Sequence, residues 1–177
     1  MRIHKITLLL FLILSLKTVA QNRQNFIGIN PSVTVEPFYN KGELDVNILP
    51  FVYQRTITEI ADLRFTSVLN LGIRNNGNSI SHFGLETALP VFFKKKEDKM
   101  ELSKGFFIAP VISLTRNRTD NHNNIGTWVE PGYNLLFDNK FAMSFGLQIG
   151  GTYFSYDNGT DKWRNHFGVK IIFGKWL

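Results

Sequence analysis

Alternation of apolar and polar residues is the feature that most constrains the fold of this chain. In residues 63–78, Leu63, Phe65 and Leu71 occupy odd positions, whereas Arg64 and Asn70 occupy even ones. Successive side chains of a β-strand point to opposite faces, so this period of two predicts a strand with one apolar and one polar face. The Asn- and Gly-rich residues that follow predict a turn, because both residue types tolerate positive φ.

The same pattern recurs along most of the chain and is interrupted by turn-rich stretches. We expect eight strands, at residues 26–38, 43–56, 63–74, 81–94, 105–116, 126–137, 141–156 and 166–176. No long stretch repeats at the helical period of about 3.6 residues. The sequence therefore predicts an all-β protein.

The composition of the second strand face indicates where the apolar face points. In the clearest strand, Phe145, Leu147 and Ile149 oppose Ser144 and Gly146. Small and polar side chains suit the crowded interior of a narrow eight-stranded barrel, which leaves the apolar face to contact lipid. We therefore expect a closed, antiparallel, eight-stranded up-and-down transmembrane β-barrel, because backbone groups in lipid require a closed sheet.

Finer expectations concern the strand ends and interruptions. Aromatic residues near strand ends suggest interfacial girdles. They are Phe38, Tyr53, Phe93, Phe137, Phe141, Tyr153, Tyr156 and Trp176. Proline removes a ladder donor, so gaps or bulges are expected at Pro31, Pro37, Pro50, Pro90, Pro110 and Pro131.

Two further expectations concern strand phase and loops. In residues 43–56, Val52 is expected on the outward face, and Tyr53 and Arg55 on the inward face. Both chain ends are expected on the periplasmic side, with longer external loops at residues 117–124 and 157–164.

The first 20 residues have the pattern of a signal peptide. Arg2 and Lys5 belong to a basic start, an apolar run follows at residues 6–16, and Ala20 ends a stretch of small residues. The apolar run is shorter than the roughly 20 residues that a spanning helix needs. We expect a signal peptide at 1–20 and one barrel domain at 21–177, with an uncleaved anchor helix as the alternative.

Charge and cysteine content narrow the classes of function. The formal net charge is +6, and subtracting Arg2, Lys5 and Lys17 of the expected leader leaves about +3 for the remaining chain. The remaining basic residues are dispersed, so we expect no nucleic-acid partner. The chain has no cysteine, which excludes disulfides, a thiolate nucleophile and cysteine-bound metals.

The strand pattern and the last strand, FGVKIIFGKWL, resemble those of known membrane barrels. From Phe26 to Leu177 the chain is similar to the small eight-stranded outer-membrane barrels, such as OmpX and the transmembrane part of OmpA. Its Asn- and Lys-rich composition is similar to that of small barrels of the Bacteroidota. The resemblance implies the outer membrane of a Gram-negative cell, contact with lipopolysaccharide, and insertion by the barrel-assembly machinery. The chain departs from the pattern by ending in Trp176-Leu177 rather than in Phe.

Ionisable residues on the expected inner faces are the candidate site. The central candidates are Glu36, Arg64, Glu86, Glu130, His166 and Lys170, and the same faces carry Asp45, Arg55, Arg74, His82 and Lys94. Ionisable groups within a membrane suggest a proton or ion path. In so narrow a barrel we instead expect opposite charges to pair and to form a structural network in a filled lumen.

An enzymatic site is not expected. Lipid A deacylases of this architecture carry a His-x-Ser pair, in which histidine activates a serine nucleophile. This chain has only the adjacent Ser81 and His82, which a regular strand would point to opposite faces. The histidines also lack the short paired spacing of zinc sites, so we expect no catalytic residue, cofactor or metal.

The expected function is therefore that of an integral outer-membrane barrel with a packed lumen and a structural or interaction role. Service as an accessory subunit of a larger membrane complex is one form of that role, although the sequence identifies no protein partner. The alternatives are a lipid-modifying enzyme, a porin-like pore for small solutes, and a soluble lipocalin-like barrel that binds a ligand.

Overall fold

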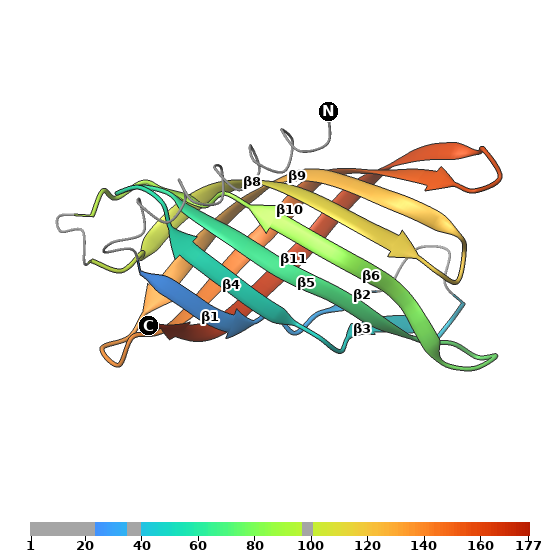
Figure 1. Ribbon diagram of the computed structural model, residues 1–177, viewed down its shortest axis with the longest axis horizontal. Helices are drawn as coiled ribbons and strands as arrows, with labels where there is room; N and C mark the ends of the chain where they lie inside the picture. The colour runs from blue at the N-terminus through green and yellow to red at the C-terminus, as the bar shows by residue number, and fades with distance from the viewer. Residues whose placement is uncertain (1–23, 35–39, 97–100) are drawn as a thin grey trace, which may run out of the picture.

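A computed structural model describes residues 24–34, 40–96 and 101–177 of the chain. The expected signal peptide, Glu36, Pro37 and Phe38 lie outside the described residues. Within them the protein is an all-β antiparallel barrel (Figure 1). The part of the chain described holds no helix long and apolar enough to cross a membrane.

The described residues contain eleven β-segments. Their bounds are β1 Asn25–Ile29, β2 Val33–Thr34, β3 Leu44–Asn47, β4 Phe51–Thr56, β5 Asp62–Ile73, β6 Ser79–Ala88, β7 Val91–Phe92, β8 Gly105–Asn117, β9 His122–Leu136, β10 Phe141–Tyr156 and β11 Asp161–Trp176.

These segments form eight strands, because three strands are each interrupted once. The interrupted strands are β1/β2, β3/β4 and β6/β7. β5 pairs with both β3 and β4, and β8 pairs with both β6 and β7. β1 and β2 in turn pair with β4 and β3, the two parts of one strand. Each strand pairs antiparallel with the next, and β1 pairs with β11 to close the ring. The predicted closed eight-stranded antiparallel barrel is confirmed.

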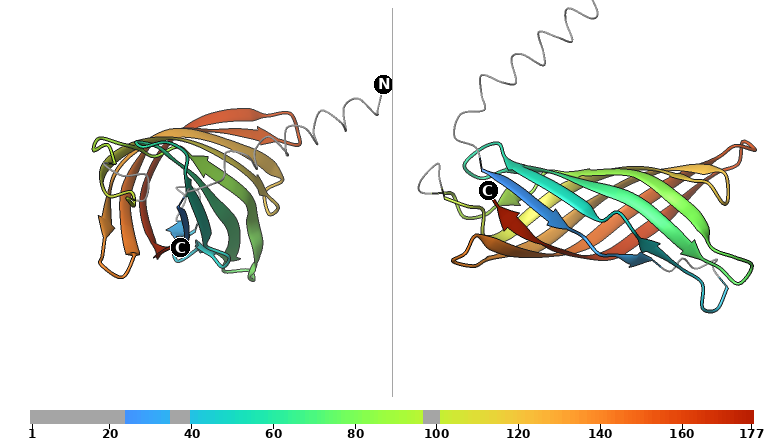
Figure 2. Two further views of the ribbon diagram at one scale, coloured as in Figure 1. Left: turned by 60° about the vertical axis from the view of Figure 1, so that its left-hand side comes forward. Right: turned by 60° about the horizontal axis from the view of Figure 1, so that its bottom comes forward.

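The chain enters and leaves the barrel at the same end. The start of β1 and the end of β11 lie together there (Figure 2), and we call this the terminal end. The opposite, distal end carries the turns at residues 74–78, 118–121 and 157–160. The expected long loops at 117–124 and 157–164 are instead short turns, because β8, β9 and β11 extend into those ranges.

Proline accounts for the interruptions. Pro31, Pro50 and Pro90 lie in the gaps of the three broken strands, as expected from the missing N–H donor. Across the first two gaps, Asn30 still donates its backbone N–H to the carbonyl of Pro50 at 2.7 Å. β8 itself runs unbroken through Pro110, but its pairing with β6 and β7 is interrupted there, between Val111 and Ile108.

The interior and exterior of the barrel differ sharply in polarity. On β10, Phe145, Leu147 and Ile149 are 38%, 46% and 56% exposed, whereas Gln148 is only 6% exposed. All eight strands contribute exposed large apolar side chains, which we call the apolar belt. Its members include Ile27, Ile29, Ile48, Phe51, Ile73, Phe83, Leu85, Phe106, Ile108, Ile112, Leu114, Ile125, Val129, Leu135, Phe145, Leu147, Ile149, Phe167 and Val169. The expected reversal of the globular arrangement is therefore present.

The phase of β4 differs from the expectation. Val52 is fully buried in the lumen together with Gln54 and Thr56, so Tyr53 and Arg55 lie on the outward face. The interruption at residues 48–50 inserts an extra position, and a shift of one residue exchanges the two faces of a strand. The hydroxyl of Tyr53 donates to Oδ1 of Asn25 on the neighbouring strand at 2.8 Å.

Only some of the aromatic residues expected on the outer surface near strand ends lie there. Phe93 and Phe137 are exposed, but Trp176 is 1% exposed and packs against Phe26 inside the terminal end, with ring centroids 5.5 Å apart. Trp176 shares the parity of the buried residues of β11, which has no break to change it. Tyr156 also turns inward and packs on His122 at 4.7 Å.

Candidate functional site

Four ionisable side chains and one amide, each from a different strand, meet in the middle of the lumen. Arg64 Nη2 lies 2.5 Å from Glu130 Oε1, and Lys170 Nζ lies 3.3 Å from Glu130 Oε2. Lys170 also forms an ion pair with Glu86. Gln148 donates to Glu130 Oε2 at 3.1 Å and faces Glu86 Oε2 at 3.4 Å. We call these five residues the central network.

Strand alternation explains why these residues converge. Each occupies an inward position on β5, β6, β9, β10 or β11, so none competes with the apolar belt. Small residues make room for them: a Cβ on Gly146 would approach the side chain of Glu130 to 2.8 Å. The sequence thus alternates bulky charged positions with glycine, as a narrow lumen requires.

The central network is electrically balanced. Two cations, Arg64 and Lys170, face two carboxylates, Glu86 and Glu130, and all four side chains are at least nine-tenths buried. A buried charge costs several kcal/mol unless it is paired and hydrogen-bonded, and here each charge has an opposite partner. The middle of the lumen is therefore filled by buried charges that each have an opposite partner.

His166 extends this arrangement toward the distal end. Its Nε2 lies 3.2 Å from Oε1 of Gln148, and its ring stacks on Trp128 with centroids 4.1 Å apart. Because Gln148 contacts both His166 and Glu130, it joins the histidine to the central network. The sequence pattern marked Gln148 as inward but gave no sign of this bridging role.

A second polar cluster lies closer to the distal end. Asp45 accepts from Arg74 Nη2 at 2.7 Å and lies 3.1 Å from Nδ1 of His82. Nε2 of His82 is 3.0 Å from the side-chain amide of Asn117, which also donates to Asp120. The cluster links β3, β6, β8 and Arg74, which directly follows β5, and these strands are neighbours in the wall.

Ser81 and His82 do not point to opposite faces, contrary to the expectation from regular alternation. The register of β5 and β6 shifts between Asn70 and Leu71, which leaves Ser81 without a paired residue, and both side chains are buried. Ser81 Oγ and Asp45 Oδ2 both approach Nδ1 of His82, at 3.3 and 3.1 Å. A Ser-His-Asp triad needs serine and aspartate on opposite ring nitrogens, and this geometry lacks that feature.

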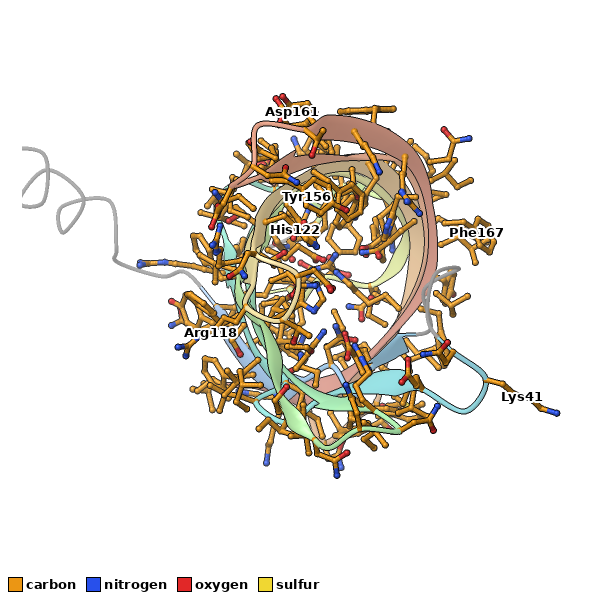
Figure 3. All side chains as sticks on the ribbon, turned by 90° about the vertical axis from the view of Figure 1, so that its right-hand side faces the viewer. Lys41, Arg118, His122, Tyr156, Asp161 and Phe167 are labelled. Atoms are coloured by element: carbon orange, nitrogen blue, oxygen red, sulfur yellow. The ribbon has the colours of Figure 1, made fainter. Side chains whose placement is uncertain are left out.

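A small cavity borders the second polar cluster and His166. Its volume is ≈ 150 Å³, and its walls include Asn70, His82, Thr115, Thr152 and His166. Figure 3 views the lumen from the distal end, where His122 and Tyr156 lie inside the ring of strands while Phe167 points away from it. The cavity is small compared with the roughly 300 Å³ or more of typical ligand pockets.

The distal end carries an ion pair and a carboxylate that accepts hydrogen bonds from backbone N–H groups of the turns. Arg116 donates to both oxygens of Asp157 at 2.7 and 2.6 Å, which joins the β8–β9 and β10–β11 hairpins. This hydrogen-bonded pairing lowers the pKa of Asp157. Backbone N–H groups of Asn40 and Asn75 similarly lower the pKa of Glu43, which accepts from both.

A buried ion pair near the terminal end is absent from the sequence-based candidates. Lys96 Nζ lies 3.3 Å from Asp62 Oδ1 and donates to Thr56 at 3.1 Å, while Gln54 donates to Asp62 at 2.7 Å. The sequence places Lys96 in a charged stretch that is typical of a solvated turn, so no pattern marked it as buried.

The structure places the predicted site residues as follows. Arg64, Glu86, Glu130 and Lys170 meet in the central network, and His166 joins it through Gln148. Asp45, Arg74 and His82 belong to the second polar cluster. Lys94 is exposed, and Arg55 is on the outer face. Among the described residues, no group of three or more His, Asp or Glu side chains is arranged to hold a metal ion.

Comparison with known proteins adds no relative: no family model matches the chain, and neither a curated protein nor a solved structure is significantly similar to it.

Proposed function

We propose that this protein is an integral outer-membrane β-barrel, similar in architecture to OmpX and the transmembrane part of OmpA, with a structural or interaction role. The apolar belt carries the proposal. Monomeric soluble proteins rarely expose contiguous apolar patches of more than a few hundred Å², whereas lipid-facing barrel surfaces are apolar all round. Burial of the charged groups inside the ring supports the same orientation.

The contents of the lumen weigh against the alternatives. A lipocalin-like carrier needs an apolar interior, but Arg64, Glu130 and Lys170 occupy the middle of this one. A pore needs an open path, which the central network and the buried Phe107 and Trp128 obstruct. A hydrolase of the serine–histidine type needs a geometry that Ser81 and His82 do not have.

Neighbouring single-cysteine variants provide the test, since the chain contains no cysteine of its own. Leu147→Cys and Gln148→Cys lie on opposite faces of β10 and serve as matched controls for each other. A fluorophore attached to the thiol of Leu147→Cys should be quenched by bromine-labelled lipids in isolated outer membranes, and one attached to Gln148→Cys should not. Recovery in periplasmic fluid, or equal quenching in both variants, would contradict the proposal.

A further inference from the structure

The chain contains two Asn-Gly pairs, and both lie in turns at the distal end of the barrel. Asn76-Gly77 belongs to the turn that joins β5 to β6, and Asn158-Gly159 belongs to the turn that joins β10 to β11. All four residues are exposed. Both glycines have positive φ, +123° at Gly77 and +80° at Gly159. The two turns therefore present the same dipeptide to solvent in the same kind of backbone setting.

An exposed Asn-Gly pair is chemically open to spontaneous deamidation in water. Hydroxide removes the proton of the glycine N–H, and the nitrogen then bonds to Cγ of the asparagine while the Cγ–Nδ2 bond breaks. The leaving nitrogen takes a proton from water and departs as ammonia, which restores the hydroxide. Water then opens the cyclic imide to aspartate or isoaspartate, so the overall change is hydrolysis of one amide. Glycine favours the attack because it has no Cβ to obstruct the approach.

The glycine N–H is held in the same way in both turns. Gly77 donates to the carbonyl of Arg74 at 3.2 Å, and Gly159 donates to the carbonyl of Tyr156 at 3.0 Å. Each of these bonds must break before the glycine nitrogen can attack. This part of the barrier therefore differs little between the two sites.

The asparagine side chains, in contrast, are held differently. Oδ1 of Asn158 accepts from the backbone N–H of Thr160 at 3.0 Å and also from the hydroxyl of Thr160. The residue in the corresponding position after Asn76 is Asn78, whose Oδ1 accepts from the N–H of Arg74 at 3.3 Å. Among the described residues, the side-chain amide of Asn76 has no hydrogen-bond partner. The side chain of Asn158 is thus anchored, whereas that of Asn76 can rotate.

Anchoring raises the barrier to cyclisation, because the side chain must leave its donors before Cγ can turn to the glycine nitrogen. Two hydrogen bonds of ordinary net strength slow a step that must break them by about tenfold. We propose that Asn76 is a site of spontaneous deamidation and that Thr160 protects Asn158 from the same reaction.

Deamidation of Asn76 changes the turn and the second polar cluster beside it. Isoaspartate routes the chain through the side-chain carbon, so it adds one carbon to the backbone of the turn. Arg74, which opens this turn, pairs with Asp45 of the second polar cluster. The new charge also enters a turn that already binds the carboxylate of Glu43 through the N–H of Asn75. The expected consequence is a looser distal turn, and the change is irreversible because the ammonia is lost.

Mass spectrometry of the purified, folded, full-length barrel in detergent tests the proposal. The protein is incubated at neutral pH and digested, and the peptides that contain each Asn-Gly pair are followed over time. We expect Asn76 to convert about tenfold faster than Asn158 and to yield both aspartate and isoaspartate. A chain unfolded in urea is the matched control, because both sites are Asn-Gly and should then react at similar rates.

Variants of Thr160 isolate the protecting group. Thr160→Val removes the hydroxyl donor with little change in shape, so Asn158 should react about threefold faster while Asn76 keeps its rate. Thr160→Ser retains the hydroxyl and should leave both rates as they are. Thr160→Ala provides the same test if Thr160→Val fails to show the heat-modifiable migration of a folded barrel.

Four outcomes overturn the inference. They are equal rates at the two sites in the folded barrel, faster conversion of Asn158, a difference that persists in urea, and an unchanged rate at Asn158 in folded Thr160→Val. None of these readouts involves a membrane, so they fail independently of the test of the proposed function.

Discussion

At the scale of single residues, the balance of the central network makes Glu130 the most sensitive position. Glu130 pairs with both Arg64 and Lys170, but only Lys170 retains a second carboxylate, Glu86, when Glu130 is lost. Removal of one partner of a buried pair leaves an uncompensated charge and costs about 3–5 kcal/mol. We expect Glu130→Leu to lower the free energy of unfolding by that amount in urea titrations of the detergent-solubilised barrel.

The matched control removes both charges. Replacement of a buried ion pair by apolar residues of similar volume is often neutral or stabilising. The double variant Arg64→Met/Glu130→Leu should therefore recover most of the stability lost by Glu130→Leu alone. If the double variant is as unstable as the single one, the loss comes from packing rather than from an unpaired charge.

At the scale of elements, the ion pair between Arg116 and Asp157 connects two hairpins at the distal end. The ion pair lowers the pKa of Asp157 in the folded protein. Its contribution to folding stability is therefore fully present above the unfolded-state pKa of about 3.9, and it is lost as the pH falls through the lower folded-state pKa of Asp157. We expect the hairpin contact to persist from neutral pH to below pH ~4.

A carboxyl-detected NMR titration of Asp157 measures this directly. Its midpoint should lie below that of a model aspartate in the wild type and should rise in Arg116→Gln, which retains most of the side-chain length but removes its charge. A midpoint that does not move in Arg116→Gln would assign the shift to another group.

The elements also show what strand periodicity predicts and where it fails. Unbroken strands such as β10 and β11 follow the parity of their sequence throughout, so the outward set Phe145, Leu147 and Ile149 was predictable. The error in β4 arose at residues 48–50, where an irregular stretch exchanges inside and outside. The bulge at Ser81 had the same effect, because no residue type there announces an extra position.

At the scale of the whole molecule, the contents of the lumen were predictable but its contacts were not. The alternation of inward and outward positions along each strand was enough to assign Arg64, Glu86, Glu130 and Lys170 to the lumen. Which of them touch depends on the register of all eight strands and on the resulting stagger of the barrel, which no local pattern records. The pair Lys96–Asp62 was missed for a related reason, because Lys96 packs beside the β4–β5 turn, where its N–H donates to the carbonyl of Glu59, and is buried although its sequence context is charged.

The filled lumen leads to a prediction about transport through the whole barrel. The central network crosses the interior at mid-depth, and Phe107 and Trp128, 2% and 8% exposed, add bulk beside it. An eight-stranded ring leaves room mainly for side chains, so we expect no continuous water path through it. Wild-type protein reconstituted in planar bilayers should therefore produce no stepwise conductance. A variant with Arg64, Phe107 and Glu130 all changed to alanine, once shown to be folded by heat-modifiable migration, should conduct ions because three bulky side chains buried in the lumen have been removed. Stepwise currents from the wild type would mean that the network opens in the bilayer, and its ion pairs would then form a gate rather than a brace.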